Sequence, residues 1–230
     1  MDPLAKDFFL NTFPGITTGI DIQDDILTTE APVVELPLDV DVQTLLQLVK
    51  DIPTDPTKRK LYPYENWPRI QGWHHKMLWS DGTVCPIMDD VYYKKQCAPV
   101  PLIEPNGVEQ LVKEQINKLG INPNMCMLSV LHPDGYIRPH RDINLLDKHL
   151  GYFWLPLNNP PGNELKIYPY GTVDVTLGNL YLLNQNSFTH AVVNNSSEMR
   201  YVIVGWFDQV SAELDQLIRT SIAAQYNQNI

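Results

Sequence analysis

The stretch from Asn179 to Phe207, NLYLLNQNSFTHAVVNNSSEMRYVIVGWF, holds three short apolar runs separated by polar residues. The runs are NLYLLN, HAVV and RYVIVGWF, and the residues between them are rich in Asn and Ser. Short runs with β-branched and aromatic residues, bounded by turn formers, are typical of β-strands. The stretch therefore predicts three consecutive strands with no helix between them.

The same texture extends back to Asn124 and adds five more runs: MCMLSVL, YIRPH, YFWLPL, ELKIYPY and VDVTL. Eight short strands without a helix-length interruption favour an antiparallel double-sheet roll or barrel over a parallel α/β sheet. We therefore expect a mostly β fold with flanking helices. Small barrels of this kind often hold a ligand in the mouth.

The predicted strands divide the chain into three regions. Residues 121–210 form the predicted β core, residues 1–120 a loop-rich and helical region that packs on it, and residues 211–230 a C-terminal helix. Apolar residues at helical spacing predict helices over residues 41–51, 107–119 and 211–225. Eight prolines lie between Pro53 and Pro105, so we expect an irregular stretch there, with His74 and His75 in a packing loop.

Composition narrows the class of function. Of the 230 residues, 17 are Lys or Arg and 27 are Asp or Glu, and the net charge of −10 repels a phosphate backbone. We therefore expect no nucleic-acid partner. The sequence has no apolar window long enough to span a membrane, and three cysteines are too few for a disulfide framework. We expect a cytoplasmic protein with no membrane association.

Two His-x-Asp pairs are candidate metal ligands, since residues two apart on a strand point to the same face. His132 and Asp134 flank turn material, Pro133–Gly135, which should splay them apart. His140 and Asp142 sit on an unbroken strand pattern, and His190 begins a later strand. Two imidazoles and one carboxylate on one side of a metal are the ligand set of non-haem Fe(II) oxygenases. His190 alone would be better interpreted as a structural histidine.

Arg200 is a candidate anion-binding residue. Val202 and Val204 share its predicted face and should be buried, and a buried arginine needs an anion because it cannot lose its charge. If the NNSS turn closes a hairpin with an odd loop, Arg200 faces His190 at about 5 Å. That geometry suits a short diacid, although a salt bridge to a core acid is the alternative. Arg138 and Arg141 are best interpreted as surface charges.

The stretch from Gly135 to Asp208 resembles the aspartyl/asparaginyl β-hydroxylase family of Fe(II)- and 2-oxoglutarate-dependent dioxygenases, including free-proline cis-hydroxylases. The resembling pieces are GYIRPHRD, YFWLPL, LGNLYLLN and HAVVNNSSEMR. The resemblance implies a double-stranded β-helix of the jelly-roll, cupin-like kind. It implies His140, Asp142 and His190 as iron ligands and Arg200 as the anchor of 2-oxoglutarate. One branch of the family lacks the metal-binding acid, whereas this chain keeps Asp142.

The resemblance further implies O₂-dependent hydroxylation of a C–H bond, with release of succinate and CO₂. The substrate expected is an amino-acid side chain, free or in a polypeptide. On neighbouring predicted strands, three aromatic residues are candidates for the co-substrate pocket, or alternatively core residues: Tyr152, Trp154 and Tyr181. The alternatives for function are a nucleobase-oxidising dioxygenase and a jelly-roll module that binds a metal or carboxylate without turnover.

Overall fold

The computed structural model describes residues 31–56, 70–82, 102–140, 151–185 and 187–226. The strands are β1 (Val33–Leu36), β2 (Asp55–Pro56), β3 (Ile70–Ser80), β4 (Ile121–His140), β5 (Gly151–Pro156), β6 (Asn163–Tyr168), β7 (Gly171–Thr172), β8 (Leu180–Leu183), β9 (Thr189–Asn194) and β10 (Arg200–Val210). The helices are α2 (Val42–Val49), α3 (Val108–Asn117) and α4 (Ala212–Tyr226).

The long strand β4 organises the sheet because it serves two layers. Its first half pairs with β10, and its second half pairs with β9. Between the halves lies the Pro-Asp-Gly stretch, where Asp134 has φ +58° and the register with β3 jumps from Leu131 to Tyr136. The extra residues form a bulge, which bends a strand without ending it. The predicted turn at this place is thus a kink within one strand, not a chain reversal.

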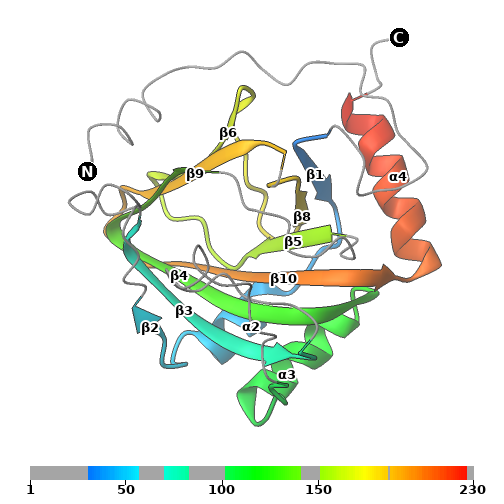
Figure 1. The fold of residues 1–230 in the computed structure, drawn as a ribbon, viewed down its shortest axis with the longest axis horizontal. Helices are drawn as coiled ribbons and strands as arrows, with labels where there is room; N and C mark the ends of the chain where they lie inside the picture. Colours follow the sequence, from blue (N-terminus) through cyan, green and yellow to red (C-terminus); the bar gives the residue numbers. More distant parts are fainter. Residues whose placement is uncertain (1–30, 57–69, 83–101, 141–150, 186, 227–230) are drawn as a thin grey trace.

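The sheet order is β1-β8-β5-β10-β4-β9-β6-β7, with β3 on the other side of β4. The bend in β4 curls this sheet into two facing layers (Figure 1). One apolar cluster, which we call the interior cluster, joins residues from both layers, for example Leu131 and Val204 with Leu165 and Val192. The fold is the predicted antiparallel double-sheet roll, a jelly roll.

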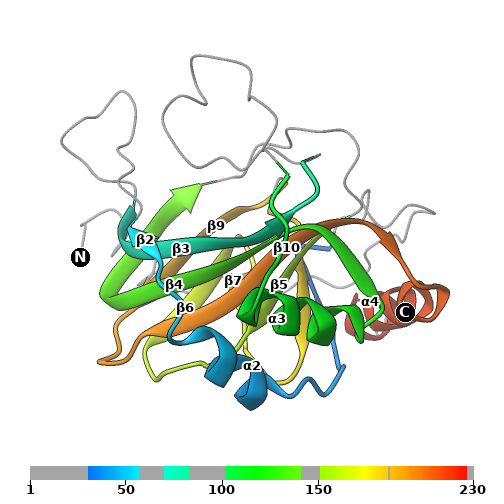
Figure 2. The same cartoon turned by 90° about the horizontal axis from the view of Figure 1, so that it is seen from below.

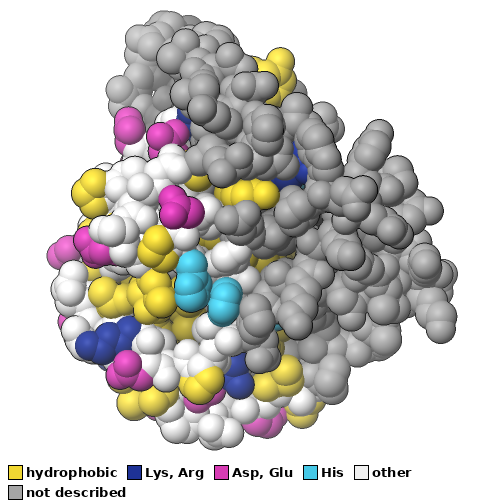
Figure 3. Space-filling model, turned by 90° about the vertical axis from the view of Figure 1, so that its left-hand side faces the viewer, with side chains coloured by type: hydrophobic (Ala, Val, Ile, Leu, Met, Phe, Trp, Pro, Cys, Tyr) yellow, Lys and Arg dark blue, Asp and Glu magenta, His cyan; other side chains and the backbone are white. Residues whose placement is uncertain are grey.

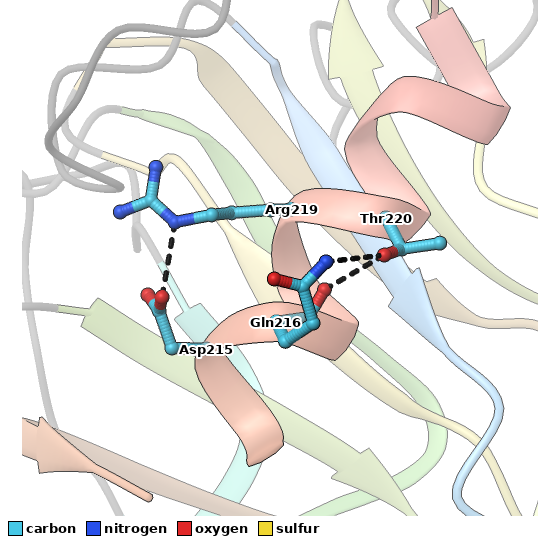
Figure 4. A network of polar contacts seen from close by, with 4 residues as sticks. All are labelled: Asp215, Gln216, Arg219 and Thr220. Atoms are coloured by element: carbon cyan, nitrogen blue, oxygen red, sulfur yellow. Dashed lines mark hydrogen bonds and ion pairs between the residues drawn. The ribbon is translucent and has the colours of Figure 1, made fainter. Parts of the chain in front are cut away.

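The three helices cover the outer face of the larger layer, which holds β1, β8, β5, β10 and the first half of β4, as the two ribbon views show (Figure 1, Figure 2). A second cluster joins their apolar stripes to the outward side chains of β4, β5 and β10. The exposed side of α4 is stabilised by contacts one turn apart, Asp215 with Arg219 and Gln216 with Thr220 (Figure 4). No helix among the described residues is long and apolar enough to cross a membrane.

The helix predictions over residues 41–51, 107–119 and 211–225 are confirmed by α2, α3 and α4. Two predictions of local structure were wrong. The VDVTL run forms no strand; instead the Tyr181 hydroxyl accepts a hydrogen bond from the Thr176 amide at 2.7 Å. Residues 70–80 were expected to be irregular, but they form the eleven-residue strand β3, which pairs along β4. The division of the chain into three regions stays a prediction.

Asn194 ties the link between β9 and β10 to the bend in β4. It is fully buried, and its amide nitrogen lies 2.9 Å from the Leu131 carbonyl, 3.1 Å from that of His132 and 2.7 Å from that of Glu198. Its amide oxygen accepts a 2.6 Å hydrogen bond from the Ser196 hydroxyl. One side chain therefore holds three backbone segments together beside the start of β10.

Replacing Asn194 with alanine should lower the free energy of unfolding by about 3 kcal/mol, because buried carbonyls lose their donors and a cavity remains. Urea denaturation measures this change. Asn195→Ala is the matched control, since Asn195 is exposed and, among the described residues, contributes a hydrogen bond through its backbone amide alone. The control should stay within about 0.5 kcal/mol of the wild type. An equal, small effect of both substitutions would contradict the role given to Asn194.

Candidate active site

A second bulge in β4 turns His140 toward the interior. Ile137 is opposite Val192 and His140 is opposite His190, so three steps along β4 match two along β9. Strict alternation would place Ile137 and His140 on opposite faces, and the extra residue cancels that. Val192 and Ile137 pack in the interior cluster, so His140 and His190 face the interior as well.

The two imidazoles lie side by side. Their ring centroids are 4.3 Å apart with an interplanar angle of 47°, and His190 is only 8% exposed. A metal with N–metal distances of about 2 Å needs two imidazoles at this kind of spacing. The sequence predicts that these two residues lie close together although they are 50 positions apart, and their rings do so.

Backbone carbonyls fix which ring nitrogen carries the proton. The Nδ1 atom of His140 lies 2.7 Å from the Arg138 carbonyl, and that of His190 lies 3.3 Å from the Phe188 carbonyl. A carbonyl oxygen only accepts, so each Nδ1 donates and each Nε2 of a neutral ring carries the lone pair. Metal-ligating histidines are held in this way by a partner on the other nitrogen. The sequence did not identify these two carbonyls.

Asp142, the third predicted ligand, lies outside the described residues, as does Arg141. Within the described ranges no group of three or more His, Cys, Asp or Glu side chains is placed to hold a metal. The described part of the site thus brings together two imidazoles, those of His140 and His190. The role of Asp142 stays a prediction.

The other His-x-Asp pair belongs to a different face. His132 stacks on His74 of β3, with centroids 4.2 Å apart and an angle of 28°. Histidine side chains reach the surface beside hydrophobic ones on the face shown in Figure 3. His74 and His75 lie in a strand and not in the predicted loop, and as adjacent strand residues they point to opposite faces.

Arg200 is buried in the interior, and no described residue forms an ion pair with it. It is 2% exposed, and no described side chain or backbone group accepts a hydrogen bond from its Nε or Nη2. Its guanidinium lies 5.1 Å from the centroid of the Trp154 ring. Burial lowers the pKa of Arg200 to about 10, and the neighbouring Tyr152 phenol acts in the opposite direction. Arg200 therefore stays cationic at neutral pH, and no salt bridge to a core acid is seen among the described residues.

Arg200 and His190 are not the facing hairpin neighbours that the sequence suggested. Arg200 is opposite Leu131 on the first half of β4, whereas His190 is opposite His140 on the second half. The NNSS link thus passes from one layer to the other instead of closing a hairpin. The two residues approach the interior from different layers, so a ligand between them would span the space between the sheets.

The three aromatic candidates differ in what they can offer. Trp154 lies against Arg200, and Tyr152 is near enough to influence the pKa of Arg200. The Tyr181 ring packs edge-on against Trp154 at 5.3 Å, but its hydroxyl donates to Glu35 at 2.9 Å. Burial raises the pKa of Tyr181 to about 12. Tyr181 thus contributes its ring to the interior and its hydroxyl to the outer edge of the sheet.

Arg138 is not the surface charge that the sequence suggested, because only 5% of it is exposed. Its backbone carbonyl accepts the hydrogen bond from Nδ1 of His140 and so contributes to the site.

Solved structures support the fold. A 2OG-Fe(II) oxygenase family oxidoreductase from Burkholderia pseudomallei aligns with a TM-score of 0.52 at 12% identity, covering 88% of this chain and 98% of that one. A Pseudomonas putida prolyl-4-hydroxylase aligns with a TM-score of 0.49 at 13% identity, covering 79% and 95%. At these identities the first likeness shows a shared fold. No curated protein sequence matches the chain.

The sequence profile described as aspartyl/asparaginyl β-hydroxylase matches residues 41–209, well over half of the chain. The match includes both halves of β4, the paired histidines and Arg200. It also begins far upstream of the Gly135–Asp208 stretch from which the sequence resemblance was drawn. The chain therefore belongs to the aspartyl/asparaginyl β-hydroxylase family.

Proposed function

We propose that this hydroxylase, which uses Fe(II), 2-oxoglutarate and O₂ as its family does, acts on an amino-acid side chain, either free or within a polypeptide. The reaction converts a substrate C–H bond, O₂ and 2-oxoglutarate into a C–OH bond, succinate and CO₂. One oxygen atom enters the product and the other enters succinate, so atoms and electrons balance.

We assign His140, His190 and Asp142 to iron, and Arg200 to the far carboxylate of 2-oxoglutarate. When bound, the iron and the co-substrate supply the oxidising power for the C–H bond. His140 and His190 present Nε2 because the carbonyls of Arg138 and Phe188 hold Nδ1. Arg200 neutralises and orients the co-substrate, and the buried residues around it exclude water.

The observation that carries this proposal is the guanidinium of Arg200, whose Nε and Nη2 have no acceptor among the described residues, in the same interior as the paired imidazoles. A buried cation with two donors lacking acceptors is unfavourable unless an anion binds there. A carboxylate accepts a bidentate pair from an arginine and corrects both defects at once. A metal-binding module without turnover would not need this second charged site.

The test is a screen for substrate-dependent succinate formation with Fe(II), 2-oxoglutarate and O₂. The panel contains L-proline, L-leucine, L-aspartate and L-asparagine, each free and as the N-acetylated, C-amidated form. At least one member should raise succinate formation and give an equimolar product heavier by one oxygen atom. Stimulation only by alkylated nucleobases would overturn the amino-acid assignment, and iron binding without any 2-oxoglutarate consumption would favour the binding module.

Replacing Asp142 with alanine should reduce turnover by more than about 100-fold, as expected when a direct metal ligand is removed. Succinate release under saturating Fe(II) measures the effect. Asp134→Ala is the control, because Asp134 belongs to the other His-x-Asp pair. Full activity of Asp142→Ala would mean that two histidines suffice to hold the metal.

A further inference from the structure

Strand β3 presents three side chains to the interior, and we call Trp73, His75 and Met77 the β3 wall. They are opposite Leu131, Ser129 and Met127 of β4, in that order. Leu131 and Met127 belong to the interior cluster, so the facing residues of β3 point to the same side. Two contacts agree with this: Trp73 packs on the interior cluster, and its indole Nε1 donates to the Ser129 hydroxyl at 2.7 Å.

The β3 wall differs from the rest of the interior in its access to solvent. Its three residues are half-buried, whereas their partners Leu131, Ser129 and Met127 are 0%, 6% and 4% exposed. The reason is the position of β3 at the edge, where its outer side pairs, within the described part of the chain, only with the two-residue strand β2 and, at Ser80, with Ile103. The wall therefore faces inward and remains within reach of a molecule from solution.

The wall also adjoins the co-substrate anchor. Trp73 is opposite Leu131, and Leu131 is opposite Arg200, so the three form one row across three strands. Two strand spacings separate Trp73 from Arg200, which is about 10 Å at the backbone. A small ligand on the wall would thus lie beside a co-substrate bound at Arg200.

From these observations we propose that the β3 wall binds the substrate and is a determinant of specificity. This inference rests on the proposed function. The indole of Trp73 is held in place by Ser129 and offers a flat apolar surface, and Met77 adds a polarizable side chain. The His75 ring, 5.5 Å from the Trp73 ring, adds a polar group. The wall contains no carboxylate, ammonium or guanidinium group, so it suits an uncharged, apolar part of an amino acid or peptide.

The alternating strand supplies matched controls. His74 and Lys76 lie between the wall residues and point to the opposite face, where His74 stacks on His132. Trp73→Ala and His75→Ala should each raise KM for the panel member most active with the wild type, by about tenfold for Trp73, the size expected for a lost aromatic contact. His74→Ala and Lys76→Ala should change KM by less than about twofold.

Two further measurements separate binding from damage to the fold. The affinity for 2-oxoglutarate, measured without O₂, should stay within about twofold of wild type in Trp73→Ala, since Arg200 is untouched. Trp73→Phe keeps the ring and should restore most of the substrate affinity. An active wild type with equal KM in Trp73→Ala and His74→Ala would overturn the β3 wall alone. If the wild type shows no substrate-stimulated turnover, the proposed function is overturned, and the role of the β3 wall with it.

Discussion

Substitution of His140 by alanine is expected to abolish both iron binding and turnover. Losing a group that only orients a metal ligand lowers affinity about 10- to 100-fold, so losing the ligand itself should exceed 100-fold. The substitution would leave His190 without its partner, the imidazole whose ring centroid lies 4.3 Å from its own. Equilibrium dialysis against Fe(II) under anaerobic conditions and succinate release in air measure the two effects.

His132→Ala is the matched control, because His132 is on the same strand and also precedes an aspartate by two residues. It stacks on His74 and takes no part in the imidazole pair. Iron affinity and turnover of this variant should remain close to wild type. Equal losses in both variants would mean that the effect comes from folding. A loss in His132→Ala alone would mean that the metal binds at His132 and Asp134 and not at His140.

Substitution of Arg200 by methionine is expected to have opposite effects on ligand binding and on stability. Affinity for 2-oxoglutarate should fall by about 2 kcal/mol or more, roughly 30-fold, because a charge-assisted bidentate pair is lost. The ligand-free protein should unfold at equal or higher urea concentration, because an apolar chain replaces a buried charge whose Nε and Nη2 have no acceptor among the described residues. The lowered pKa of Arg200 agrees in sign. At any pH below about 10 the arginine is charged in both the folded and the unfolded state, and burying this charge destabilises the folded state.

Urea denaturation without ligands and a 2-oxoglutarate titration of the iron-loaded protein provide these two numbers. Arg219→Met is the control, since Arg219 lies on the helix α4, outside the sheet, and pairs with Asp215 at 3.0 Å (Figure 4). That variant should change stability by less than about 1 kcal/mol and leave co-substrate affinity unchanged. A large loss of stability in Arg200→Met with normal 2-oxoglutarate affinity would show that the arginine is structural.

Much of the core was predictable because alternation and turn residues are local signals. The runs that became β5, β8, β9 and β10 needed no knowledge of their partners. Strand β3 was missed because prolines and tryptophans around it suggested irregular chain, although Trp73, His75 and Met77 alternate with His74 and Lys76. The VDVTL run alternates as well, but it forms no strand, and its Thr176 amide donates a hydrogen bond to the hydroxyl of Tyr181 in β8.

The site depends on features that local patterns do not carry. His140 was predicted as a ligand, yet its inward direction results from a bulge that only the register with β9 reveals. The predicted facing of Arg200 and His190 was wrong because β9 and β10 follow one another along the same edge of β4, opposite its second and first halves. Asn194 was interpreted as a turn residue, whereas its buried amide joins the two layers. Long-range pairing decides each of these, and a single sequence holds no direct signal for it.

The most direct measurement is an anaerobic titration of the metal-free protein with Fe(II) and then 2-oxoglutarate, followed by visible absorption. The central claim is that the imidazole pair and Arg200 hold iron and co-substrate in one interior. It predicts a weak charge-transfer band that requires both additions, is absent in His140→Ala and needs far more 2-oxoglutarate in Arg200→Met. Iron binding with no band at any 2-oxoglutarate concentration, or an unchanged titration in either variant, would contradict it.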